Sequence, residues 1–279
     1  MERNDFAEYN KASFSKEYSW GMFLNELRYT REFIDNLCYL VFGRDMNVIY
    51  TNIGLSPVYS NHILQSAAQT LQSAIVCAEY GNLADVHLLI RKYRDDLFFY
   101  LYIIIACNSN DFFTDEKTNK KQQNIKLWNQ NELSNLNIST VLKEISRFDK
   151  CTLFIEKYKL KDSFTRMGKK LNDYTHGNGR SYYNRLHSNY YADEIDVLAN
   201  DLKYMLNYIS ISFVFILLLL HPEYIVATDY FDAFDTSTVP DKKSQYWVAP
   251  FVREFIERYK SILDESALDY LRETTELDL

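Results

Sequence analysis

Apolar residues recur at helical spacing through most of this chain, and no other feature of the sequence restricts the fold as strongly. Apolar positions three and four residues apart fall on one face of a helix. The longest stretches with this spacing span residues 17–42, 59–80, 82–107 and 194–220. Strand-like alternation is limited to a weak hint at 47–50. The pattern predicts an all-α protein: an up-down helical bundle built around long helices, with a helical C-terminal extension.

The chain is poor in the residues that make tight turns. Its 279 residues include 7 glycines and 4 prolines. Together these are about 4% of the chain, whereas roughly 12% is usual. Sandwiches, barrels and Rossmann folds depend on turns that are rich in Gly and Pro. The scarcity therefore argues against these three folds and supports the helical prediction.

Breaks in the helical pattern suggest the domain organisation. Residues 1–16 look like a loose arm, and the polar segment 108–123 is expected to be an exposed loop. We expect one helical domain over 17–222, followed by an acidic loop and C-terminal helices over 223–279 that pack on it. Shorter helices are expected near 124–136, near 139–148 with Ser139 as N-cap, and near 151–158, 163–175, 245–263 and 265–274.

The N-terminus, the cysteines and the apolar runs favour a cytoplasmic protein with no membrane span. The first residues lack the apolar core of a secretory signal. The longest apolar run, 208–220, has 13 residues. Because a span needs roughly 20 residues, we expect this run to be a buried core helix. The four cysteines are far apart and include no CxxC pair, which favours free thiols in a reducing compartment.

The net charge of −7 is distributed unevenly along the chain. Residues 142–190 hold eleven Lys and Arg against five Asp and Glu, whereas residues 191–279 hold seven against seventeen. Aromatic residues are interleaved with the basic ones in the middle segment. A polyanion such as RNA would meet its most favourable potential there, and aromatic rings can stack on bases. The alternative interpretation is a solvated helical face beside core aromatics.

Two histidines lie close together in the basic segment, in the sequence LNDYTHGNGRSYYNRLH. They are His176 and His187, and Asp173 lies one helical turn before His176, where it could orient the imidazole. Histidine titrates near neutrality, as a general acid or base must. Arg180 and Arg185 add fixed positive charge of the kind that stabilises a phosphoryl transition state. These residue types point to chemistry on a phosphodiester.

Arg180 and His187 have six residues between them, a spacing that resembles the R-x(4–6)-H motif of the HEPN superfamily. The segment 91–103 (RKYRDDLFFYLYI) is also similar to the helices of HEPN-like domains. The superfamily is all-α and is common in bacterial toxins, abortive-infection systems and CRISPR effectors. The resemblance implies metal-independent cleavage of RNA, with no cofactor, in antiviral defence or in a toxin–antitoxin system.

The resemblance also implies roles for individual residues. His187 would act as general acid or base, and Arg180 would neutralise developing charge while an RNA 2′-hydroxyl attacks the adjacent phosphate. His176 is the alternative histidine, because LNDYTHGNG also resembles helical relatives of unknown function that keep a histidine at a helix end. The candidate RNA-binding side chains are Arg166, Lys169, Lys170 and Arg185.

HEPN sites form across a dimer, so the resemblance further implies a homodimer in which each protomer contributes one copy of the motif. RNA is the expected partner, and a restraining protein partner such as an antitoxin is a possible second one. The competing interpretation is that the histidines are structural, capping helix C-termini and packing against the Tyr-rich segment.

The alternative function is a non-catalytic helical protein that binds or scaffolds other proteins. The high aromatic content motivates it, because aromatic side chains favour interfaces. Trp247, Tyr246, Phe251 and Phe255 on one amphipathic helix would form a docking face. The alternative for these four residues is that they simply close the core.

The other polar groups carry weaker signals. His62 and His87 have no His or Cys at metal-ligand spacing and are expected in the core or an interface, and His221 is expected at a helix C-terminus. Arg91 and Asp95 are expected to form an i,i+4 ion pair in a charged cluster with Arg94 and Asp96. If this charged cluster has a functional role, we expect it to line a cleft beside residues 166–187. No metal site is expected.

Overall fold

The computed structural model describes most of the chain. The described residues are 11–42, 44, 47–51, 54–107, 120–132, 136–175, 192–226, 236, 248–275, 277 and 279. Helices dominate them, as predicted, and form a bundle of long helices with a helical C-terminal part. The long helices are α2 Tyr18–Val41, α3 Asn61–Glu79, α4 Leu83–Cys107, α8 Leu160–Thr175 and α10 Ala192–Leu220.

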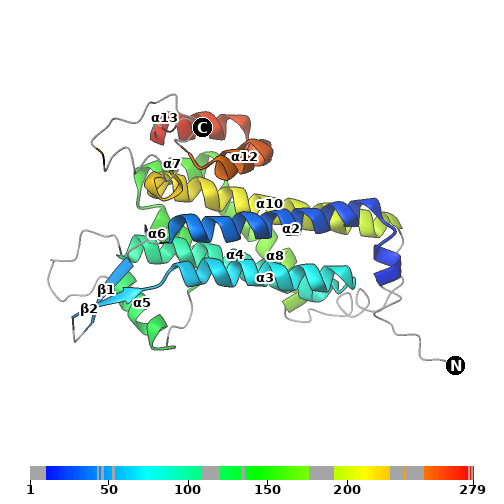
Figure 1. Ribbon diagram of the computed structural model, residues 1–279, viewed down its shortest axis with the longest axis horizontal. Coiled ribbons are helices and arrows are strands. Elements are labelled where there is room, and N and C mark those ends of the chain that lie inside the picture. Colours follow the sequence, from blue (N-terminus) through cyan, green and yellow to red (C-terminus); the bar gives the residue numbers. More distant parts are fainter. Residues whose placement is uncertain are drawn as a thin grey trace.

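Side-chain contacts give the direction of each long helix. The indole of Trp20, near the start of α2, donates to the carbonyl of Ala78 at the end of α3, a distance of 2.9 Å, so the two helices are antiparallel. Contacts between Lys92 and Thr70 and between Asp96 and Ser66 make α3 and α4 antiparallel as well. The bundle therefore runs up and down through these three helices (Figure 1).

Helices α8 and α10 complete the bundle. Helix α8 runs antiparallel to α4, and α10 runs antiparallel to α8 and parallel to α2. Helix α10 contacts α2, α4 and the C-terminal helices, so it lies at the centre (Figure 1). Its run 208–219 is buried throughout, because apolar side chains surround this part of the helix on every side.

Helix α10 is long and apolar enough to cross a membrane by length and composition. Its most apolar window has a mean hydropathy of 1.8, and 89% of that window is buried inside the structure. Such burial is what the core helix of a soluble protein shows, and it agrees with the expected packing of 208–220.

The remaining elements are short. They are β1 Asn47–Thr51, β2 Gly54–Val58, α5 Lys120–Asn129, α6 Ile138–Ile145, α7 Asp149–Lys157, η2 Pro222–Ile225, α12 Pro250–Tyr259, η3 Lys260–Ile262 and α13 Glu265–Thr275. Helices α12 and α13 pack against α10 (Figure 1).

Two local details of the fold differ from the sequence predictions. The connector after α2 contains an antiparallel hairpin, in which β1 pairs with β2 from Asn47 opposite Val58 to Thr51 opposite Gly54. The N-cap of α6 is Asn137, not Ser139: the Asn137 side chain accepts a hydrogen bond from the backbone N–H of Thr140 at 3.0 Å. A two-residue offset of this kind arises because Asn and Ser cap equally well.

The described part of the expected loose arm, residues 11–16, belongs to the fold, and residues 1–10 lie outside the described residues. Residues 11–14 are helical, and the ring of Phe14 is buried against Trp20, with 4.7 Å between the ring centroids. Phe14 also lies on Gly81, whose φ of +66° makes the turn between α3 and α4. This part of the arm therefore closes one end of the bundle.

Replacing Gly81 by alanine is expected to destabilise the protein by about 2 kcal/mol, because the left-handed backbone costs a Cβ-bearing residue roughly 1–2 kcal/mol. The new Cβ would also lie 2.6 Å from Cδ2 of Phe14, so that ring must shift. Gly21 is the matched control: it lies within α2 with nothing within 4 Å of an added Cβ. Gly21→Ala should stabilise by about 0.5–1 kcal/mol through helix propensity. Urea unfolding of both variants measures the two changes in the free energy of unfolding. Changes of the same sign in both variants would contradict the prediction.

Two of the four residues that were predicted to form a docking face pack against the bundle instead. Phe255 is fully buried and stacks on Phe33 of α2, with ring centroids 3.8 Å apart, and Phe251 is partly buried against the same ring at 5.7 Å. Both residues therefore close the core. Trp247 and Tyr246 lie outside the described residues.

Candidate functional site

Four of the predicted site residues, the three catalytic candidates and one RNA-binding candidate, lie outside the described residues. They are His176, Arg180, Arg185 and His187, all in the segment that follows the last residue of α8, Thr175. Their roles stay predictions. What the structure describes is the helix that leads into this segment and the helices that support it.

Helix α8 is amphipathic, and its basic residues lie on the solvent side. Its buried positions include Phe164, Met167 and Leu171, and Phe164 packs edge-on against Phe98 of α4 at 4.8 Å. The exposed positions Arg166, Lys169, Lys170 and Asp173 are three and four residues apart and therefore share one face. The three candidate RNA-binding residues of α8 thus occur together on one exposed face.

Two of these cations already have polar contacts. The ammonium of Lys170 lies 2.7 Å from Asp201 of α10, and Arg166 reaches the hydroxyl of Ser163 at 3.4 Å. Both members of the Lys170–Asp201 pair are about half exposed. Exposed pairs of this kind are weak, so Lys170 can exchange its carboxylate partner for a phosphate at little cost.

A buried arginine lies beneath α8. Arg94 of α4 is 5% exposed, and its Nε and Nη2 donate to Oδ1 of Asp95 at 2.9 and 2.6 Å. Its Nη1 is 3.4 Å from the position that a Cβ on Gly168 would occupy. This distance is an ordinary van der Waals contact, so it shows that α8 passes directly over the guanidinium of Arg94. The expected pair between Arg91 and Asp95 is also present, at 3.8 Å.

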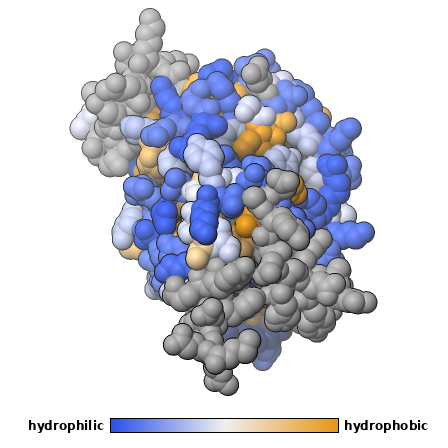
Figure 2. All heavy atoms as spheres, turned by 90° about the vertical axis from the view of Figure 1, so that its right-hand side faces the viewer, coloured by the Kyte–Doolittle hydropathy of each residue, from blue (hydrophilic) through white to orange (hydrophobic). Residues whose placement is uncertain are grey.

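The antiparallel packing determines which part of α4 faces the end of α8. Phe98 meets Phe164 and Arg94 meets Gly168, so the N-terminal half of α4 lies toward the end of α8. This end of the bundle faces the viewer in Figure 2, where most described side chains are hydrophilic. The segment carrying His176 follows directly from this end of α8.

Of the other three histidines, His87 and His221 lie where they were expected, whereas His62 is not in the core. His87 is buried, and its Nδ1 lies 2.7 Å from the carbonyl of Leu83 one turn earlier. His62 is exposed and stacks on Tyr59. His221 directly follows α10, as predicted, and its Nδ1 lies 2.8 Å from Glu223. Within the described part of the chain, no three His, Cys, Asp or Glu side chains are grouped so that they could hold a metal ion.

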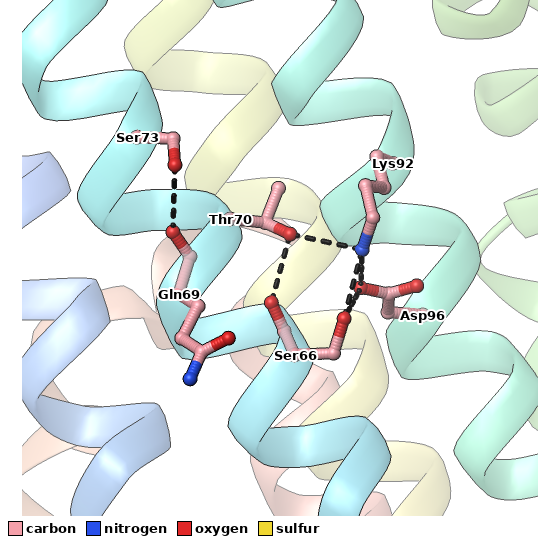
Figure 3. Close-up of polar contacts among 6 residues, drawn as sticks. All are labelled: Ser66, Gln69, Thr70, Ser73, Lys92 and Asp96. Carbon is pink, nitrogen blue, oxygen red and sulfur yellow. Dashed lines mark hydrogen bonds and ion pairs between the residues drawn. The ribbon is translucent and has the colours of Figure 1, made fainter.

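A second polar cluster joins α3 and α4, and the sequence interpretation found only part of it. Lys92 points between the two helices (Figure 3), and its ammonium lies 2.5 Å from Asp96, 2.9 Å from Ser66 and 3.0 Å from Thr70. Ser66 also donates to Asp96 at 3.1 Å. Burial raises the pKa of Asp96, although the hydrogen bonds from Lys92 and Ser66 oppose this shift.

A cavity of about 270 Å³ lies next to this cluster, between α4, α5 and α6. Asp95 and Asp96 lie at one side of it. Its other walls include Phe99, Trp128 of α5, and Asn137 and Ile138 at the start of α6. A cavity thus borders Asp95 and Asp96, but the described part of its lining comes from α4, α5 and α6. The predicted cleft beside residues 166–187 is not found among the described residues, since no residue of α8 lines this cavity.

No known protein adds a functional assignment. A scan against protein-family models, a search of curated proteins and a search of solved structures each found no match.

Proposed function

We propose that this protein is a metal-independent endoribonuclease of the HEPN-like kind, acting in bacterial antiviral defence or in a toxin–antitoxin system. The observation that carries the proposal is the placement of the basic residues of α8. Arg166, Lys169 and Lys170 lie on one exposed face of a helix that ends one residue before His176. A strand of RNA bound along this face would be led to the segment that carries Arg180 and His187.

The proposed chemistry needs no metal. A histidine, His187 or His176, removes the proton from an RNA 2′-hydroxyl, which attacks the adjacent phosphate. The bond to the 5′-oxygen breaks, and this oxygen takes up a proton as it leaves. Arg180 neutralises the charge that develops on the phosphate oxygens, as a fixed cation near a phosphoryl group does.

The proposal includes partners and a compartment. RNA is the substrate, and Arg185 adds a further phosphate contact beside the motif. We propose a homodimer in the cytoplasm, with one copy of the motif from each protomer, and a restraining protein partner where the protein acts as a toxin. Light scattering on the purified chain tests the dimer, and a monomeric mass at assay concentrations would contradict it.

RNA cleavage by the purified chain in EDTA tests the function. The unmodified protein is expected to cleave, and Arg180→Ala and one of His176→Ala and His187→Ala should each lower the rate by about 10²–10⁴-fold, the usual contribution of a positioned acid or base. Arg28→Ala is the control, because Arg28 lies in an exposed pair with Glu79 that joins α2 and α3 and includes no candidate site residue. Cleavage that EDTA abolishes, or that survives both histidine changes, would refute the proposal.

The described residues do not form the docking surface that motivated the competing scaffold function. Phe255 is buried against Phe33 and is not available to a partner, and Phe251 is partly buried against the same ring. We therefore place the enzymatic proposal first.

A further inference from the structure

The cavity between α4, α5 and α6 belongs to none of the roles described above. It combines two kinds of wall. Phe99 and Trp128 form an aromatic wall, with ring centroids 5.2 Å apart in an edge-on arrangement, and Ile138 adds an aliphatic side. Flat, apolar walls of this kind suit a planar ring, which gains by stacking on an aromatic side chain.

The polar wall offers carboxylate acceptors and one amide donor, and Asp96 is the less exposed of the two aspartates. Oδ2 of Asp96 accepts from Lys92 and Ser66, while its Oδ1 accepts no hydrogen bond from any residue that the structure describes. Oδ1 of Asn137 caps α6, and within the same residues its Nδ2 donates to none. A planar ligand with a donor next to an acceptor along one edge would satisfy both groups.

The charges around the cavity argue against a cationic ligand. Asp95 is paired with Arg91 and Arg94, and Asp96 is paired with Lys92. Three cations thus surround two carboxylates, and an added cation would gain no net attraction. A neutral ring that is attached to an anionic backbone is compatible with this balance.

We infer that this cavity binds one unstacked nucleobase bearing an exocyclic amino group, with the base against Trp128 and its amino group donating to Oδ1 of Asp96. The inference rests on the proposed function, since the base would belong to the single-stranded RNA that the protein cleaves. It adds a base preference to an interface whose other contacts, on α8, are to phosphates. Adenine, cytosine and guanine carry the amino group, whereas uracil does not.

Fluorescence quenching of Trp128 tests the inference without any cleavage. The chain has three tryptophans, and Trp20 is buried in the core, so comparison with Trp128→Phe isolates the signal from the cavity. The full chain is titrated with AMP, CMP, GMP and UMP. The three amino-bearing nucleotides should quench, and UMP should bind about tenfold more weakly, as expected for the loss of one hydrogen bond to a charged group.

Two carboxylate variants separate the cavity from general charge effects. Asp96→Asn should weaken binding of the amino-bearing nucleotides by about tenfold. Glu79→Gln removes the same charge from an exposed pair and should leave the quenching unchanged. Equal quenching by UMP and CMP, or an unchanged affinity in Asp96→Asn, would overturn the inference. Quenching by arginine methyl ester but by no nucleotide would also overturn it and would indicate a cationic peptide instead.

The two proposals fail in different assays. Nucleotide-specific quenching in a protein that cuts no RNA would refute the nuclease and support the base site. Metal-independent cleavage without any quenching of Trp128 would refute the base site and support the nuclease.

Discussion

Replacing Phe255 by alanine is expected to lower the free energy of unfolding by about 3–5 kcal/mol, the usual cost of removing a buried phenyl ring. Phe255 of α12 is fully buried and stacks on Phe33 of α2 at 3.8 Å, and it also contacts Tyr259 at 4.7 Å. The change leaves a cavity between the C-terminal helices and the bundle. Urea denaturation followed by circular dichroism measures it.

Phe251→Ala is the matched control for this prediction. Phe251 contacts the same Phe33 ring, at 5.7 Å, but it is only partly buried, so its loss should cost clearly less than that of Phe255. If Phe255→Ala left stability unchanged and instead abolished binding to a protein partner, the core role would be wrong and the docking face would be restored.

The second large effect is expected at Glu26, a buried carboxylate that connects three helices. Its Oε1 lies 2.9 Å from Arg258 of α12 and 4.0 Å from Lys203 of α10, and the hydroxyl of Tyr259 donates to its Oε2. The guanidinium of Arg258 also lies 4.2 Å above the ring of Tyr29. Burial and the nearby carboxylate both raise the pKa of Tyr259, so its hydroxyl stays protonated and keeps donating.

Glu26→Ala should lower the free energy of unfolding by about 3 kcal/mol, because it leaves the Tyr259 hydroxyl without its acceptor and opens a buried polar site. Glu26→Gln keeps an oxygen that can accept from Tyr259 and should recover part of the loss. Thermal and urea unfolding of both variants measure the difference.

Glu79→Ala provides the comparison for Glu26. Glu79 pairs with Arg28 at 2.8 Å, but both side chains are well exposed, so its removal should cost less than about 1 kcal/mol. Similar losses at Glu26 and Glu79 would show that burial of Glu26 contributes nothing, contrary to the prediction.

Long helices were the most predictable part of the fold. The spacing of apolar residues over 82–107 predicted α4 closely, because each turn of that helix buries at least one of them. The sequence pattern hinted only weakly at β1, over 47–50, and did not indicate β2, since the strands have five residues each and carry little periodicity. The N-cap of α6 was placed two residues late because Asn137 and Ser139 are equally good caps, and only the backbone geometry selects between them.

The candidate sites were predictable only where their residues are neighbours in the sequence. The pair Arg91–Asp95 was expected from its i,i+4 spacing and is present. Lys92 and Asp96 have the same spacing, yet nothing in the sequence connects them with Ser66, which lies 26 residues before Lys92. The cavity next to them is also lined by Trp128 and Asn137, which come from two further segments of the chain. Helical periodicity within one segment cannot indicate that these residues lie near α4.

The sequence alone determined that this protein is all-α, where its long helices lie, and that basic residues cluster ahead of His176. These are properties of single segments, because helical periodicity and charge are local. The tertiary structure alone decided that Phe255 belongs to the core, that Glu26 links α2 to α12, and that two paired aspartates border a cavity with an aromatic wall. These features depend on which helix faces pack against each other. The hydrophobic effect that drives this packing is nondirectional, so the spacing of apolar residues in the sequence does not specify which helices become partners.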